Sequence, residues 1–134
     1  MIDAYLNHVH QGEMMISVFH KSEPSSQISK HLSTKEFKCQ CHNQCDLNVI
    51  DTRLVGAFEA TRADMGTGIR IQSGYRCTFH NLAVGGVERS YHTRGLAIDL
   101  WNGDMKKLEK VMKKHFDYVE MGRGEMYLHG HILP

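Results

Sequence analysis

Apolar and polar residues alternate along several short stretches in the second half of this 134-residue chain. Such alternation is typical of β-strands that bury one face. It predicts strands at residues 69–72 and 96–100, and a terminal hairpin of strands within 116–121 and 126–133 around a Gly-Arg-Gly turn. This half of the chain is therefore expected to form a sheet whose neighbouring strands run antiparallel.

Apolar residues spaced by three or four positions predict helices in two other segments. The first helix is expected to be capped by Asp46 and to end at Gly66. The second is expected to follow a capped turn at residues 102–104, with lysines on its solvated outer face. A shorter helical turn is predicted after Ser33, which forms a capping-box pattern with Glu36.

The first thirty residues lack a sustained pattern. Residues 1–20 carry scattered apolar positions and are interpreted as a short strand or arm, and the serine-rich residues 21–30 are predicted to be a loop. We therefore divide the chain into an N-terminal arm and loop, residues 1–30, and one folded domain, residues 31–134. The mixture of elements places that domain in the α+β class, with a central, mostly antiparallel sheet and flanking helices.

Composition narrows the classes of partner. Sixteen Lys and Arg residues against fifteen Asp and Glu residues give a formal charge of +1, so the chain lacks the basic field that nucleic-acid binding usually needs. No apolar run is as long as about 18 residues, the length that suggests a membrane-spanning helix. The N-terminus also lacks the basic and apolar regions that open a signal peptide. We expect no nucleic-acid partner, no membrane insertion, and synthesis in the cytoplasm.

Ten histidines in a chain of this length favour a metal site. His92 and Asp99 are seven residues apart, with Asp99 inside the strand predicted at residues 96–100 and His92 on the loop before it. In the last predicted strand His129 and His131 differ by two positions, so both point to one face. Imidazole nitrogens and a carboxylate oxygen suit zinc, and three protein ligands leave a fourth position for water. One or both late histidines can complete a zinc site with His92 and Asp99.

Taken together, these motifs resemble the zinc D-Ala-D-Ala carboxypeptidase family, whose members cut peptidoglycan stem peptides. The resemblance extends from about His31 to His131 and rests on His92-x6-Asp99 with Ser90 and Gly95, the preceding Ser73-Gly74-Tyr75-Arg76, Asn81 and Gly85-Gly86, and a late strand histidine. The wider group includes lysostaphin-type peptidases and the hedgehog signalling domain. The resemblance therefore implies a hedgehog/DD-peptidase-like fold.

The resemblance also assigns roles to individual residues. It makes His92, Asp99 and one late histidine the zinc ligands. His129 is preferred because an aromatic and an aliphatic residue precede it, as is usual in the family, and His131 is the rival. Arg76 matches the family's arginine that holds a substrate carboxylate or polarises the scissile carbonyl.

The general base departs from the family pattern. Relatives place an acidic residue a few positions before the last ligand, often three, or an aspartate two positions after it. Met126 and His131 occupy those positions here, and Glu125 is one residue out of register. A bulge in the hairpin would bring Glu125 to the zinc-bound water, and otherwise the His131 imidazole would take the proton. Both are kept as candidate catalytic residues.

The function implied by the resemblance is zinc-dependent hydrolysis of an amide bond in the peptide part of peptidoglycan, as a carboxypeptidase or an endopeptidase. Together with cytoplasmic synthesis it implies a phage or prophage lysin that reaches the wall after release, or a virion component. The stem peptide would be the partner, and we expect a monomer. The alternative is a non-catalytic zinc-binding module of the same fold with a structural or cell-wall-binding role, which the displaced acidic residue favours.

Each candidate also has a purely structural interpretation. His92 and Asp99 can form a hydrogen-bonded pair without a metal, although the third ligand argues against it. Arg76 can form a surface ion pair, and Glu125 can be an exposed hairpin residue.

Four cysteines remain outside these assignments: Cys39, Cys41, Cys45 and Cys77. Their spacing leaves three alternatives, which are a second, structural zinc site, reduced buried thiols, and a disulfide. A cysteine hydrolase that uses Cys77 with His80 is a further idea, but it leaves the motif at residues 90–100 unexplained.

Overall fold

A four-stranded antiparallel sheet forms the C-terminal half of the described chain, in the order β5-β6-β8-β7. The computed structural model describes residues 16–134, so most of the arm expected at residues 1–20 lies outside the described residues. The strands of this sheet are β5 (Arg70–Ser73), β6 (Ala97–Trp101), β7 (Tyr118–Met121) and β8 (Leu128–His131). The predicted strands and the terminal hairpin are therefore confirmed.

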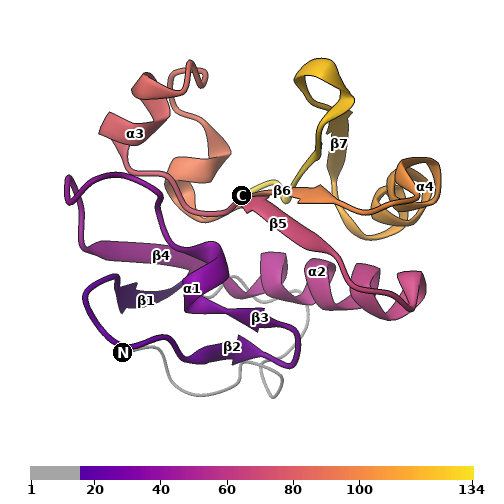
Figure 1. Ribbon diagram of the computed structural model, residues 1–134, viewed down its shortest axis with the longest axis horizontal. Coiled ribbons are helices and arrows are strands. Elements are labelled where there is room, and N and C mark those ends of the chain that lie inside the picture. The colour runs from indigo at the N-terminus through magenta and orange to yellow at the C-terminus, as the bar shows by residue number, and fades with distance from the viewer. Residues whose placement is uncertain (1–15) are drawn as a thin grey trace.

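Two smaller antiparallel sheets lie in the N-terminal half. The first pairs β1 (Ile16–His20) with β4 (Leu47–Asp51), and the second pairs β2 (Gln27–Ser29) with β3 (Leu32–Ser33). β1 and β2 fall in the region assigned to an arm and loop, and the division of the chain at residue 30 stays a prediction. Figure 1 shows these strands on one side of the molecule and the larger sheet on the other.

Helices connect and cover the sheets. They are α1 (Thr34–Phe37), α2 (Thr52–Met65), α3 (Thr78–Ala83) and α4 (Met105–His115), with 3-10 turns η1 (Tyr91–Arg94) and η2 (Arg123–Glu125). The capping box predicted at the start of α1 and the cap predicted before α4 are both present. None of the helices in residues 16–134 has the length and apolar character needed to cross a bilayer. The mixture of helices with antiparallel sheets confirms the α+β class.

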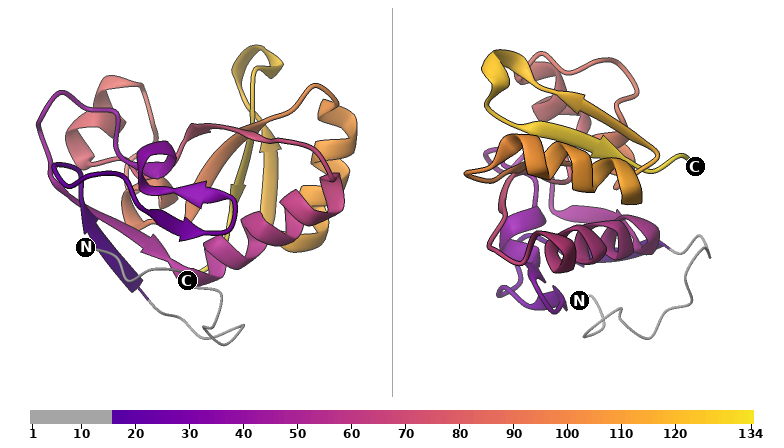
Figure 2. Two further views of the ribbon diagram at one scale, coloured as in Figure 1. Left: turned by 60° about the horizontal axis from the view of Figure 1, so that its bottom comes forward. Right: turned by 90° about the vertical axis from the view of Figure 1, so that its right-hand side faces the viewer.

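The larger sheet has one apolar and one polar face. Ile98, Leu100 and Leu128 are fully buried on the face that packs against α4, and α2 packs against α4 in turn (Figure 2). Gly130 lies on this face, and a Cβ there would come within 2.7 Å of Met112 Cε. Side chains alternate along a strand, so the neighbouring positions point to the opposite face. On that face the register aligns the polar side chains in a row across the four strands: Ser73, Asp99, His129 and Glu120.

The predicted start of the long helix is wrong. Residues 47–51 form β4, and α2 begins at Thr52 with Asp51 as its cap, while the predicted end at Gly66 is confirmed. Asp51 is fully buried, caps Arg53 N–H at 2.9 Å and accepts a further bond from Arg53 Nη2 at 3.0 Å. The proposed cap Asp46 instead accepts a bond from Ser22 N–H at 2.9 Å. The helical spacing of apolar residues continued through this segment, but pairing with β1 made it a strand.

The predicted loop at residues 21–30 is also partly wrong, because it contains β2. A half-buried carboxylate, that of Glu59, holds β2 and the turn after it to α2. Glu59 accepts hydrogen bonds from Ser29 Oγ at 2.5 Å and His31 N–H at 2.7 Å, and its other oxygen lies 2.7 Å from His31 Nδ1. Burial would raise the pKa of Glu59, but these hydrogen bonds bring it below its ordinary value.

Candidate metal centre

A left-handed turn at Gly95 joins the segment of His92 to the strand of Asp99. His92 lies in η1, where Ser90 Oγ accepts a hydrogen bond from its N–H at 3.2 Å. Gly95 ends η1 at φ 70°, and a Cβ there would come within 2.5 Å of the Val49 carbonyl oxygen. Glycine alone satisfies both conditions without strain, so this position sets how η1 leads into β6. His92 and Asp99 are each 2% exposed.

His92, Asp99 and His129 converge on one point, and we call them the histidine cluster. Asp99 Oδ1 lies 3.1 Å from His92 Nε2 and 3.1 Å from His129 Nδ1. Asp99 and His129 are cross-strand partners on β6 and β8, and His92 approaches them from η1. One ligand atom from each residue lies within 4.8 Å of the others. A tetrahedral zinc ion with nitrogen and oxygen ligands at about 2.1 Å separates them by about 3.4 Å, which is close to this spacing.

The hydrogen bond on the far side of the His92 ring indicates that the cluster suits a cation. His92 Nδ1 lies 2.8 Å from the Gly74 carbonyl oxygen, which can only accept, so Nδ1 carries the proton. In a neutral imidazole Nε2 is then an acceptor, and it faces another acceptor, Asp99 Oδ1, at 3.1 Å. Two facing acceptors need a cation or a shared proton between them. A metal-binding histidine has this arrangement, because its outer N–H is usually held by a carbonyl or carboxylate.

Arg76 lies beside the histidine cluster and holds the second oxygen of Asp99. Its Nη2 donates to Asp99 Oδ2 at 3.0 Å, Nη1 donates to Asn81 Oδ1 at 3.2 Å, and Nε donates to Ser73 Oγ at 3.2 Å. Among the described residues these three bonds leave two of the five guanidinium N–H groups for a substrate. The structure thus brings Arg76 to the site, and its role in substrate binding stays a prediction.

The ionisation of the cluster favours metal binding. Burial would raise the pKa of Asp99, but hydrogen bonds with His129 and His92 hold it well below its ordinary value. The carboxylate is therefore charged at neutral pH. A charged carboxylate and neutral imidazoles are the forms that bind metal ions.

His131 lies next to the histidine cluster and outside the group that could share an ion. Its Nδ1 is 2.9 Å from His129 Nε2, and its ring stacks on Tyr118 with centroids 4.8 Å apart. The Tyr91 ring is also close, with its centroid 4.1 Å from that of His131. Burial and the charge of His129 lower the pKa of His131 to about 4. Of the two late histidines, His129 therefore lies in the group that could share an ion and His131 lies beside it, and the identity of the third ligand stays a prediction.

Glu125 occupies the exposed turn η2 between β7 and β8, with φ 58°. Within residues 16–134 its side chain makes no hydrogen bond or ion pair with the histidine cluster. The register of the hairpin instead brings Glu120 next to the histidine cluster, because Glu120 on β7 is directly opposite His129 on β8. Side chains of such pairs share a face and lie next to each other. The Tyr118 hydroxyl donates a hydrogen bond to the Glu120 carboxylate.

Glu120 and Tyr118 were not identified from the sequence, and Ser73 was named only as part of the motif that leads to Arg76. Glu120 is distant in sequence from His129, whereas the family pattern places the general base within a few residues of the last ligand. The signal that could have found it is the pairing of the predicted hairpin: with Met121 opposite Leu128, Glu120 falls opposite His129. The roles of Glu125 and His131 as proton carriers stay predictions.

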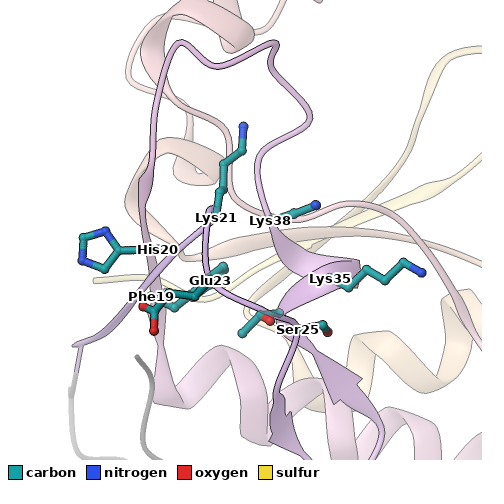
Figure 3. A pocket seen from close by; sticks show the side chains of 8 residues that line it. Phe19, His20, Lys21, Glu23, Ser25, Lys35 and Lys38 are labelled. Carbon is teal, nitrogen blue, oxygen red and sulfur yellow. The ribbon is translucent and has the colours of Figure 1, made fainter.

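A separate cavity of about 230 Å³ lies between the β1–β2 connection and α1 (Figure 3). It is lined by Phe19, His20, Lys21, Glu23, Ser25, Thr34, Lys35 and Lys38. No residue of the histidine cluster lines it, so it does not contribute to the candidate centre. The second group of metal-ligand side chains in the described residues is formed by the four cysteines.

A protein-family model described as Peptidase M15 matches residues 30–132, which include the histidine cluster, Arg76 and Glu120. No curated protein matches the chain.

Proposed function

The chain belongs to the peptidase M15 family, and on this basis we propose that it is a zinc-dependent hydrolase of an amide bond in the peptide part of peptidoglycan. Peptidases of this family depend on a metal ion. The observation that carries the proposal is the pair of facing acceptors, His92 Nε2 and Asp99 Oδ1, at 3.1 Å. With the outer ring proton held by Gly74, a cation is the partner that this pair accommodates best.

The residues of the centre divide between ligands and proton carriers. His92 Nε2, the Asp99 carboxylate and His129 would hold the ion. When bound, zinc supplies Lewis acidity that polarises the scissile carbonyl and acidifies a water molecule. Glu120, which lies opposite His129, and the His131 imidazole would accept the proton of that water and return it to the leaving amine. Glu125 is a further candidate for this role.

Arg76 provides positive charge for a peptide substrate. Two of its N–H groups point to no partner among the described residues and can pair with a terminal carboxylate or with the scissile carbonyl. A terminal carboxylate at this place would make the enzyme a D-Ala-D-Ala carboxypeptidase, and an internal bond would make it an endopeptidase. Arg76 also keeps Asp99 oriented, so the same side chain links substrate binding to the metal ligands.

The biological setting follows from the same proposal. We place the fold with the hedgehog/DD-peptidase group and infer a monomeric lysin of a phage or prophage that is made in the cytoplasm. It would act on the cell wall after release or as a virion component. The peptidoglycan stem peptide is the partner, and neither nucleic acid nor a membrane is required.

The test combines zinc analysis with mass spectrometry of digested peptidoglycan. The zinc-loaded protein should release muropeptides whose masses identify the cleaved bond. His92→Ala should bind one zinc ion fewer per chain and should no longer release muropeptides. The control is His115→Ala, which removes an imidazole that pairs with Asp64 at 2.7 Å outside the site and should change neither. Unchanged release by His92→Ala would refute the proposal.

A different outcome favours the non-catalytic alternative. A wild-type protein that binds zinc through His92 but releases no muropeptide from any of several peptidoglycan types would be a zinc-binding module with a cell-wall-binding or structural role. The observation behind this alternative is the exposed position of Glu125 away from the cluster. Sedimentation with insoluble peptidoglycan would then distinguish wall binding from a purely structural role.

A further inference from the structure

Four cysteines from two segments meet at one place in the fold, and we call them the cysteine cluster. Cys39, Cys41 and Cys45 lie between α1 and β4, and Cys77 is the N-cap of α3. Their sulfur atoms all lie within 4.8 Å of one another, and the sulfurs of Cys41 and Cys45 are 3.5 Å apart. Cys39 and Cys77 are buried, and the other two are partly exposed. The cluster shares no residue with the histidine cluster.

Backbone N–H groups point at the two buried sulfurs. The N–H of Cys77 donates to Cys39 Sγ at 3.2 Å, and the N–H of His80 donates to Cys77 Sγ at 3.4 Å. A hydrogen bond to an ionised acceptor is much stronger than one to a neutral acceptor. Backbone donors of this kind are the partners that a metal-bound thiolate needs.

Side-chain donors point at the two partly exposed sulfurs. Lys21 Nζ donates to Cys41 Sγ at 3.0 Å and to the Cys41 carbonyl at 3.2 Å, and Asn48 Nδ2 donates to Cys45 Sγ at 3.6 Å. Figure 3 shows the Lys21 side chain, which also lines the cavity described above, extending toward the loop between α1 and β4. Each of the four sulfurs thus accepts an N–H bond, which is the outer shell that bound thiolates need.

We propose that the cysteine cluster binds one structural zinc ion through four thiolates. Sulfur ligands at about 2.3 Å in a tetrahedron lie about 3.8 Å apart, a spacing that small side-chain rotations produce here. Binding releases the thiol protons, and the complex carries two negative charges. The Lys21 ammonium offsets part of this charge. Four protein ligands leave no position for water, so the ion would stabilise the fold and take no part in hydrolysis.

Disulfides account for the arrangement less well. A disulfide joins two sulfurs at about 2.05 Å and uses the cysteines in pairs. The four sulfurs here all lie within 4.8 Å of one another, and each has its own N–H donor. Donors of this kind stabilise charge on sulfur, which a disulfide does not carry.

The ion would connect two distant parts of the chain. It would tie the loop between α1 and β4 to the start of α3, and Cys77 directly follows Arg76 in the sequence. Because a metal site of this kind does not exist in the unfolded chain, the free energy of zinc binding adds to the free energy of folding. This proposal does not depend on peptidase activity.

The test measures zinc in the intact chain, purified under reducing conditions, with variants that separate the two clusters. The wild type should hold two zinc ions per chain, and His92→Ala/His129→Ala should hold one. Cobalt in that double variant should give the intense thiolate-to-cobalt charge-transfer absorption in the near ultraviolet. Cys41→Ser/Cys45→Ser should lose one zinc ion and the cobalt absorption.

A wild-type measurement keeps the proposal testable if a variant fails to fold. A mercurial reagent that modifies the thiols should release one zinc ion per chain to a chromophoric indicator. No release, or no thiolate-to-cobalt absorption in His92→Ala/His129→Ala, would overturn the proposal. Mass spectrometry that finds disulfides between these cysteines in the native protein would also overturn it. Failure of the peptidase proposal appears separately, as absent muropeptide release from a protein that still holds its thiolate-bound zinc.

Discussion

Gly74→Ala tests whether the backbone behind His92 sets the metal affinity of the histidine cluster. The Gly74 carbonyl accepts the His92 Nδ1 hydrogen bond at 2.8 Å. A Cβ on Gly74 would lie 2.4 Å from Phe37 Cδ1 and 2.5 Å from the Phe37 carbonyl oxygen. Phe37 is fully buried, and its carbonyl accepts a bond from Tyr75 N–H at 2.8 Å, so neither atom can easily move aside. The Gly74 backbone must move instead and carry its carbonyl away from His92.

The size of the effect follows from this overlap. Ordinary contact starts at 3.4 Å, so relieving a 2.4 Å approach takes a displacement of about 1 Å. Overpacking of this kind lowers the free energy of unfolding by about 1–3 kcal/mol. Loss of the outer hydrogen bond to a metal-binding histidine weakens metal binding by about 10–100-fold. We expect both losses in Gly74→Ala.

Two measurements separate these losses. Urea unfolding of the metal-free protein gives the stability change, and muropeptide release titrated against buffered free zinc gives the affinity of the histidine cluster alone. Gly56→Ala is the matched control, because Gly56 lies within α2 with no atom within 4 Å of an added Cβ. It should raise the free energy of unfolding by about 0.5–1 kcal/mol. It should leave the zinc midpoint, the free zinc concentration that gives half-maximal muropeptide release, unchanged. A folded Gly74→Ala protein with the wild-type zinc midpoint would refute the reasoning.

The remaining predictions concern one proton carrier and two carboxylates of the fold. Glu120→Gln should lower kcat for muropeptide release by a factor of about 10²–10⁴ at constant zinc content. The control Glu109→Gln, on α4, should leave kcat unchanged. Equal rates for the two variants would exclude Glu120 as the general base. The pKa of Glu59 is lowered in the folded state. The Glu59 carboxylate therefore stabilises the fold above its unfolded pKa of 4.5, and this stabilisation is lost as the pH falls through its folded pKa. Urea midpoints of the wild type and Glu59→Gln should accordingly differ at pH 7 and converge in acid. Asp51→Ala should lower the free energy of unfolding in urea by about 3 kcal/mol, because it removes the cap of α2 and the ion-pair partner of Arg53, and a loss below about 1 kcal/mol would contradict this.

Local patterns predicted the elements whose signals agree. In α4 the capping aspartate, the apolar stripe and the lysine-rich outer face all indicate one helix, and the structure has it at Met105–His115. Residues 47–51 carry two patterns, because their apolar residues fit both a helix and a strand. The choice depends on β1, a partner in the region without a sustained pattern. A sequence window contains no information about such a partner, and the helix start was misplaced for that reason.

The same distinction applies to the site. His92 and Asp99 lie within one turn and strand, so their spacing was enough to predict that they meet. The motif-based family assignment is confirmed by the match to Peptidase M15. His129 was preferred to His131 on the family pattern, and the register adds that His129 lies opposite Asp99. Predicting Glu120 at the site would also have required the pairing of β7 with β8, which a spacing rule within one segment does not contain.

The segment from Ser73 to Cys77 physically connects the two proposed metal sites. Ser73 is the cross-strand partner of Asp99, and the Gly74 carbonyl orients His92. Arg76 holds the outer oxygen of Asp99, and the next residue, Cys77, contributes a sulfur to the cysteine cluster. Every bond that fixes Cys77 therefore also restricts the backbone of Arg76. Zinc at the cysteine cluster would act on the histidine cluster through this segment, by limiting how far Arg76 and the carboxylate that it holds can move.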